Sequence, residues 1–141
     1  MPLKQNAEIS YSALQQIRHW ISLISLTRNE YEYVFIHDIQ SDEHLDTMVL
    51  VANHKLDIGL MIEYNQKNLP HFMEWKSLAS GDYVLGLEPS NSSVYGKLHH
   101  IENDSVHYLK PLKKERNILK FSVIEGKDNI QQFINKINKL I

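Results

Sequence analysis

Residues 82–91, DYVLGLEPSN, form an apolar strand pattern that ends in a carboxylate, a proline and an amide. Side chains alternate between the two faces of a strand, so Glu88 shares its face with Gly86. A glycine inside a strand often marks a place where a ligand or another backbone comes close. An ionisable group one side-chain position from such a gap therefore indicates a binding site. The alternative is a strand-end glutamate that faces solvent.

Aromatic and polar residues gather in the sequence on both sides of Glu88. An aromatic ring packs on the C–H face of a sugar while donors and acceptors bind its hydroxyl groups, so this composition is typical of a polyol site. The alternative is that the aromatic rings are core anchors beneath a loop. The set comprises His71, Phe72, Trp75, Lys76, Glu88, Asn91, Tyr95 and Lys97.

The eight histidines raise the question of a metal site. The densest cluster is His99, His100 and Glu102, but adjacent residues on a strand point to opposite faces, so one ion would not take both histidines. No His-Glu-x-x-His motif, glycine-rich dinucleotide motif, phosphate loop or Gly-x-Ser-x-Gly elbow occurs. We therefore expect no metal and no cofactor.

Composition limits the class of protein. The 141 residues are enough for one domain, residues 1–141, and 43% hydrophobic with 23% charged residues is ordinary for a globular chain. A net charge of −2 without a basic run predicts neither a nucleic-acid nor a membrane partner. The chain has no cysteine and no apolar signal region at its start, so a cytoplasmic location is expected.

Hydrophobic periodicity predicts the elements that hold these residues. A helix is expected over residues 11–26, followed by strands near 31–37, 46–52 and 57–64 that short turns would join into an antiparallel meander. Residues 71–76 have an aromatic and irregular pattern. In the strand that follows, pairing is expected to stop at Pro89, which lacks an N–H.

The C-terminal third is predicted to contain two further strands and a helix. The strands lie near residues 106–110 and 116–124, and in the second Leu119, Phe121 and Val123 would form the buried face. Asp128 would cap a helix with an apolar stripe. The outcome is a mainly antiparallel sheet of about six strands with a helix near each end of the chain. One face of such a sheet would be left uncovered, which favours a partner chain.

Three stretches carry a family resemblance. Residues 69–76, LPHFMEWK, residues 81–91, GDYVLGLEPSN, and the pair Gly96-Lys97 together resemble the C-terminal part of the aldose 1-epimerase (galactose mutarotase-like) superfamily. The similarity is greatest to its bacterial aldose-epimerase-like branch and runs from residue 32 to the region of Pro111. Residues 32–37, EYVFIH, and Asn53 also fit the pattern of that branch.

The resemblance implies an antiparallel β-sandwich, part of the galactose mutarotase-like supersandwich, that binds a sugar in a groove. It implies that Glu88 is the general base for the anomeric hydroxyl, while a histidine protonates the ring oxygen and the ring opens and recloses. Partial burial would raise the pKa of such a carboxylate toward the operating pH. Asn91, Trp75 and Lys76 correspond to groove positions.

The general acid has no matching position in this sequence. Full members of the superfamily are longer, and their acid and substrate clamp lie in the half that precedes the region seen here. His37 or His71 would have to substitute as the acid. Both histidines are also substrate-binding candidates.

Three interpretations follow, and catalytic activity is left open. The first is a C-terminal aldose-epimerase-like domain that binds a small sugar and interconverts its anomers. The second is a non-catalytic sugar-binding or assembly module that lacks the acid-bearing half. The third is a structural β domain. The expected protein partner is a second copy in a homodimer or a missing N-terminal half.

Overall fold

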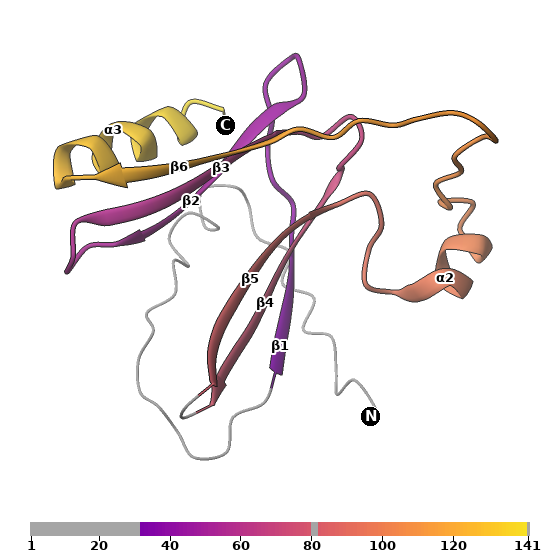
Figure 1. The fold of residues 1–141 in the computed structure, drawn as a ribbon, viewed down its shortest axis with the longest axis horizontal. Coiled ribbons are helices and arrows are strands. Elements are labelled where there is room, and N and C mark those ends of the chain that lie inside the picture. Colours follow the sequence, from indigo (N-terminus) through magenta and orange to yellow (C-terminus); the bar gives the residue numbers. More distant parts are fainter. Residues whose placement is uncertain (1–31, 80–81, 141) are drawn as a thin grey trace.

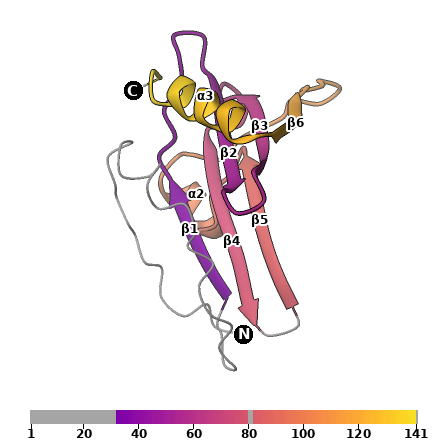
Figure 2. The same cartoon turned by 90° about the vertical axis from the view of Figure 1, so that its left-hand side faces the viewer.

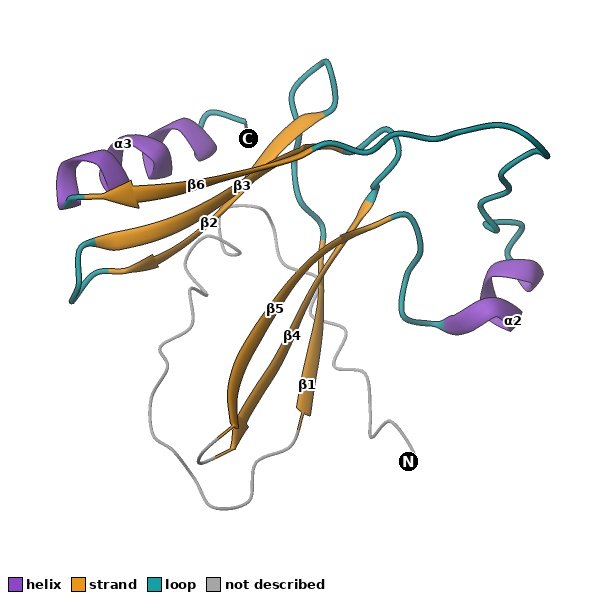
Figure 3. Ribbon diagram, in the orientation of Figure 1, coloured by secondary structure: helices purple, strands orange, loops and turns teal. Residues whose placement is uncertain are grey.

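The computed structural model describes residues 32–79 and 82–140, which form two antiparallel sheets and two helices (Figure 1). The elements are β1 (Glu32–His37), β2 (Asp46–Asn53), β3 (Ile58–Asn65), β4 (His71–Ala79), β5 (Asp82–Ser90), α2 (Gly96–Glu102), β6 (Leu119–Glu125) and α3 (Lys127–Ile137). Along this part of the chain, strands β1 to β5 precede helix α2, and β6 lies between α2 and α3, as Figure 3 shows.

The first sheet has the strand order β1-β4-β5, and all its neighbours are antiparallel (Figure 2). β4 lies in the middle because it pairs with β1 on one side and with β5 on the other. The register aligns Phe35 of β1 and Leu87 of β5 with Glu74 of β4. Residues that lie opposite each other in this way point to the same face, so the register decides which side chains can meet.

The second sheet has the order β2-β3-β6 and is also antiparallel. β2 and β3 form a hairpin whose turn is held by Asn53. The side-chain oxygen of Asn53 accepts hydrogen bonds from the backbone N–H groups of Lys55, at 3.0 Å, and Leu56, at 3.2 Å. This is the local turn that asparagine favours, because its short amide replaces a backbone acceptor.

Helix α3 covers one face of the second sheet. Its residue Ile130 is 1% exposed and packs with Leu50, Met61 and Ile124 in a core cluster. Phe133, Ile134 and Ile137 of the same helix pack against this cluster, so the apolar stripe predicted from the sequence is confirmed. The helix begins after Gly126, which has a positive φ of 89°, and Asp128 lies in the first turn instead of at the N-cap.

A second core cluster joins the two sheets. Ile62 and Tyr64 of β3 pack with Leu69 and with Phe72 of β4. The rings of Tyr64 and Phe72 are stacked, with centroids 6.2 Å apart and planes inclined by 16°. The second sheet therefore has α3 on one face and contacts the first sheet with its other face.

The mainly β class with antiparallel strands is confirmed, and so is a helix near the C-terminus. The helix predicted over residues 11–26 lies outside the described residues. The part of the chain that the structure describes contains no helix both long and apolar enough to cross a membrane.

Three predictions about strand pairing are wrong. β1 does not continue into a meander with β2 and β3, because it pairs with β4 in the other sheet. Residues 71–76 are the first part of strand β4 and are not irregular. Pairing also continues past Pro89 to Ser90. β5 is an outer strand of its sheet within the described ranges, and an outer strand tolerates a proline because half of its backbone groups need no strand partner.

Two predictions about the C-terminal third are also wrong. Residues 106–110 form no strand, and the regular element of this region is the short helix α2. β6 begins at Leu119, and its predicted buried face is the exposed one: Phe121 is 61% and Val123 63% exposed. Helix α3 packs on the other face of β6, where Ile124 is 7% exposed.

Candidate functional site

The pairing of β4 with β5 brings Glu88, Trp75 and His71 to one face of the first sheet. Glu88 lies opposite Met73, Gly86 opposite Trp75, and Ser90 opposite His71. Trp75 and His71 are therefore the two diagonal neighbours of Glu88, at a Cα separation of roughly 7–8 Å, within reach of long side chains. A carboxylate, an indole and an imidazole thus share one side of a single strand pair.

Gly86 makes room for the carboxylate of Glu88. A Cβ atom built on Gly86 would lie 2.8 Å from Oε1 of Glu88 and 3.5 Å from both Cβ and Cε3 of Trp75. The carboxylate therefore folds back across the glycine, and the Trp75 side chain borders the same space. The sequence suggested that this glycine leaves room for a ligand or another backbone, whereas the group that occupies the space here is the carboxylate of Glu88 itself.

The exposure of the side chains varies across the face that carries Glu88. Glu88 is exposed, so the partial burial expected for it is wrong. Trp75 and His71 are half-buried, and Asn91 is exposed in the bend that directly follows β5. Met73, which lies directly opposite Glu88 on this face, is 5% exposed.

The surroundings of His71 favour the neutral form of its imidazole. Burial holds the pKa of His71 below its ordinary value of 6.5, and the charge of nearby His100 lowers it further. A neutral imidazole has one N–H donor and one acceptor nitrogen. His71 can therefore donate a hydrogen bond to a hydroxyl group or accept one from it.

His100 forms hydrogen bonds with the loop that follows β5 and with the segment that follows α2. This histidine is 7% exposed, and its Nε2 lies 3.0 Å from Oγ of Ser93 and 3.2 Å from Oγ of Ser92. Its Nδ1 lies 2.8 Å from Oγ of Ser105. One buried ring therefore ties helix α2 to the segments on both sides of it. Within residues 32–79 and 82–140, no group of three or more His, Cys, Asp or Glu side chains could hold a metal ion.

His37 and Lys76 lie on the opposite face of the sheet from Glu88. Both contact Glu74, whose Oε2 lies 3.1 Å from Nε2 of His37 and whose Oε1 lies 3.3 Å from Nζ of Lys76. Nζ of Lys76 also lies 4.3 Å from the centroid of the Phe35 ring. These two candidates from the sequence are therefore held in a separate cluster and do not join Glu88.

Glu74 is the charged residue that the sequence reasoning missed. Its burial opposes ionisation, but the hydrogen bond with His37 and the charge of Lys76 outweigh that effect and hold the pKa of Glu74 below 4.5. A signal was present, because Glu74 and Lys76 are two residues apart and share a face in any strand. Because residues 71–76 were expected to be irregular, no shared strand face was predicted for Glu74 and Lys76.

The comparisons with known proteins agree with this fold. Residues 1–123 match the family described as Domain of unknown function (DUF4432). The structure is similar to the crystal structure of a "putative aldose 1-epimerase" from Klebsiella pneumoniae, with a TM-score of 0.78 and 25% sequence identity. The similarity covers 91% of this chain and 34% of that chain, so our chain spans about a third of its length. No curated protein matches.

Proposed function

The chain belongs to the DUF4432 family, and from that premise we propose that it is a carbohydrate-binding domain of the aldose-epimerase type in which Glu88 is the general base. The substrate class is a small aldose in its ring form. The fold supports this proposal, since the similar crystal structure is described as that of a "putative aldose 1-epimerase". The sequence pattern around Glu88 supports it independently.

One observation carries the proposal. The carboxylate of the exposed residue Glu88 lies over Gly86, in a space that the Trp75 side chain also borders. A pyranose has an apolar C–H face and a polar rim of hydroxyl groups. The face of an indole ring packs on the first, and a carboxylate accepts hydrogen bonds from the second.

The chemistry assigned to this face is exchange of the two anomers. Glu88 takes the proton from the anomeric hydroxyl while a donor protonates the ring oxygen, and the bond between C1 and the ring oxygen breaks. Rotation about the C1–C2 bond of the open aldehyde, followed by closure, gives the other anomer. His71 is the donor on this face, and its lowered pKa means that its protonated form is the minority at neutral pH.

Sugar binding without catalysis is the second candidate. The exposure of Glu88 favours it, because a base that is open to water gains less from its surroundings than one enclosed with its substrate. The chain also covers only 34% of its crystallographic relative, so the residues of the other two thirds are not represented in the comparison. In this case the face of Glu88, Trp75 and His71 holds the sugar and performs no proton transfer.

The experiment is anomer exchange measured by NMR with Glu88→Gln. The substitution keeps the shape of the side chain and removes its ability to accept a proton, so we expect the exchange rate to fall by about 10² or more. Sugar affinity is expected to change much less, because the amide still forms neutral hydrogen bonds and Trp75 is retained.

Glu43→Gln is the matched control, because the Glu43 side chain is 86% exposed and lies in a turn outside the site. It is expected to leave the exchange rate unchanged. Exchange at the parental rate in Glu88→Gln would remove Glu88 from the mechanism. Sugar binding by a parent chain that has no exchange activity would establish the second candidate.

A further inference from the structure

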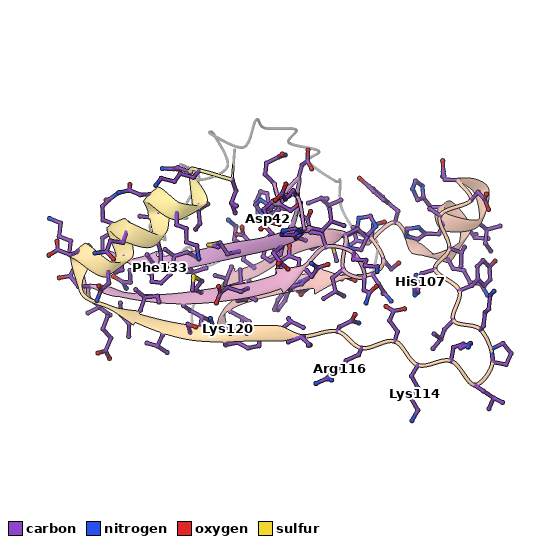
Figure 4. All side chains as sticks on the ribbon, turned by 90° about the horizontal axis from the view of Figure 1, so that it is seen from above. Asp42, His107, Lys114, Arg116, Lys120 and Phe133 are labelled. Atoms are coloured by element: carbon purple, nitrogen blue, oxygen red, sulfur yellow. The ribbon has the colours of Figure 1, made fainter. Side chains whose placement is uncertain are left out.

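Strand β6 presents an apolar face at an open edge of the second sheet. It is the outer strand of the β2-β3-β6 sheet in the part of the chain that the structure describes, and Figure 4 shows it along the outside with Lys120 labelled. On the face turned away from α3, Phe121 is 61% exposed, Val123 63% and Leu119 37%. The neighbouring strand extends this surface through Leu60, which is 40% exposed and lies opposite Val123.

This surface combines two features that folded proteins normally avoid. An outer strand has unpaired N–H and C=O groups that can bind another strand, and natural proteins protect such edges with charges, bulges or a covering element. A contiguous apolar surface marks an interaction site. Here one strand has both features, and its apolar residues alternate regularly from Leu119 to Val123.

We propose that β6 pairs with β6 of a second copy of this chain in an antiparallel, two-fold symmetric dimer. The partner strand would add to the edge and continue the sheet from three strands to six. Phe121 would lie at the two-fold axis opposite Phe121 of the second copy. Leu119 of each copy would lie opposite Val123 of the other, so the exposed apolar face becomes continuous across the interface.

β6 can pair with its own copy without placing like charges opposite each other, and its charges favour this register. With Phe121 at the axis, each Lys120 lies opposite Ser122 of the other copy, and no like charges oppose each other. Lys120 also keeps its partner within its own chain, Oε2 of Glu63 at 2.5 Å. The register centred on Ser122 is less favourable, because it would place Leu119 opposite the carboxylate of Glu125.

Within the described residues, the contact between the two sheets buries Ile62 and Tyr64 on this face of β3 but leaves Phe121 and Val123 of β6 exposed. Helix α3 packs over Ile124 and Met61 on the opposite face, so it does not occupy the side where Phe121 and Val123 lie. The proposal is independent of the proposed function, because Glu88 and Trp75 belong to the other sheet.

Disulfide cross-linking tests the register directly, because the chain contains no cysteine. Directly opposed residues of antiparallel strands have Cα atoms about 4.5–5.5 Å apart, which is within the range of a disulfide. We expect Phe121→Cys to form a covalent dimer under mild oxidation. Ser122→Cys is the matched control. Its two copies would be displaced by two residues along the strands, about 8 Å apart, and would not cross-link.

Sedimentation equilibrium with a charged variant tests the dimer without any covalent bond. We expect the parent chain to be dimeric at high micromolar concentration and Phe121→Lys to dimerise at least about tenfold more weakly, since two like charges would face each other at the axis. Leu112→Lys is the control for surface charge, because Leu112 is fully exposed in the loop between α2 and β6. It is expected to leave the dimer intact.

Either experiment can overturn the proposal. A parent chain that is monomeric at high micromolar concentration would show that a second copy does not cover this face. A covalent dimer from Ser122→Cys, or none from Phe121→Cys, would refute the register. A dimer that persists unchanged in Phe121→Lys would place the interface elsewhere. Unfolding of Phe121→Lys is checked by circular dichroism, and Val123→Lys is then the substitute.

Discussion

Because Gly86 has no side chain, it leaves space next to Glu88. The carboxylate of Glu88 occupies the space above this glycine, and Trp75 borders the same space. The conformation of Glu88 therefore depends on the absence of a side chain at Gly86. Steric room at a single strand position decides where the proposed base lies relative to the aromatic ring.

Gly86→Ala is expected to disturb ligand binding more than folding. The added methyl group would lie 2.8 Å from Oε1 of Glu88, which is the end of a flexible side chain and can turn away. The carboxylate would then leave the indole, so we expect sugar affinity to fall about tenfold, which corresponds to about 1.4 kcal/mol. Isothermal titration with a hexose measures this, and thermal unfolding monitors the fold.

The contrast with Glu88→Gln makes the result specific. Glu88→Gln keeps the position and removes the charge, whereas Gly86→Ala keeps the charge and changes the position. Unchanged sugar affinity in a normally folded Gly86→Ala protein would contradict the role assigned to this glycine.

At the scale of elements, Glu74 connects β1 to β4. Its carboxylate lies between His37 of β1 and Lys76 of β4, and its side chain is 11% exposed. A carboxylate that is taken out of water is stabilising only when it is paired on several sides, as this one is. The ion cluster therefore adds side-chain contacts to the backbone pairing of two strands that are distant in sequence.

The stability that Glu74 contributes is predicted to be lost in acid. Its pKa in the folded chain lies below the ordinary value of 4.5, so its contribution is complete above pH 4.5 and is lost as the pH falls through the lower folded value. We expect Glu74→Gln to lower the free energy of unfolding by about 1–3 kcal/mol at neutral pH. The difference from the parent is expected to shrink in acid, which urea denaturation at several pH values measures.

Glu43→Gln again serves as the control, since that exposed carboxylate contributes little to stability. It is expected to follow the parent at every pH. A Glu74→Gln protein as stable as the parent at neutral pH would refute the stabilising role of the cluster.

The elements differ in how far the sequence could predict them. Alternation alone was enough to locate β2, β3 and β5 and to put Glu88 and Gly86 on one face. β4 was missed because its aromatic residues occupy both faces, with Phe72 toward the core between the sheets and Trp75 toward the site, so no simple alternation is visible. The exposed side of β6 could not be predicted, because alternation identifies two faces but does not say which one a helix will cover.

The same limit applies to the candidate site. The sequence indicated Glu88, Trp75 and His71 as one group and added His37 and Lys76, which the strand register assigns to the other face. Distance along the sequence does not reveal which face a residue occupies once an element is misassigned. The serines that hold His100 were also beyond prediction, because a turn and a short helix bring them together.

At the scale of the whole molecule, the two described sheets meet through the cluster of Ile62, Tyr64, Leu69 and Phe72, and each sheet has a region of interest outside that cluster. One region carries Glu88 and Trp75 on the face of the first sheet opposite Phe72, and the other carries Phe121 and Val123 on the outer strand of the second sheet. The first is polar and aromatic, which suits a sugar, and the second is apolar and lies at a strand edge, which suits another chain. Ligand binding and assembly are thereby assigned to different sheets.

A hexose titration followed by two-dimensional ¹⁵N NMR tests the central claim, that the Glu88 face holds a sugar. We predict concentration-dependent shifts of the backbone amides of Gly86 and Glu88 and of the indole N–H of Trp75, with the amides of β6 unaffected. Absence of any shift at high millimolar concentrations of several hexoses, or shifts confined to the opposite face around His37 and Lys76, would contradict the account.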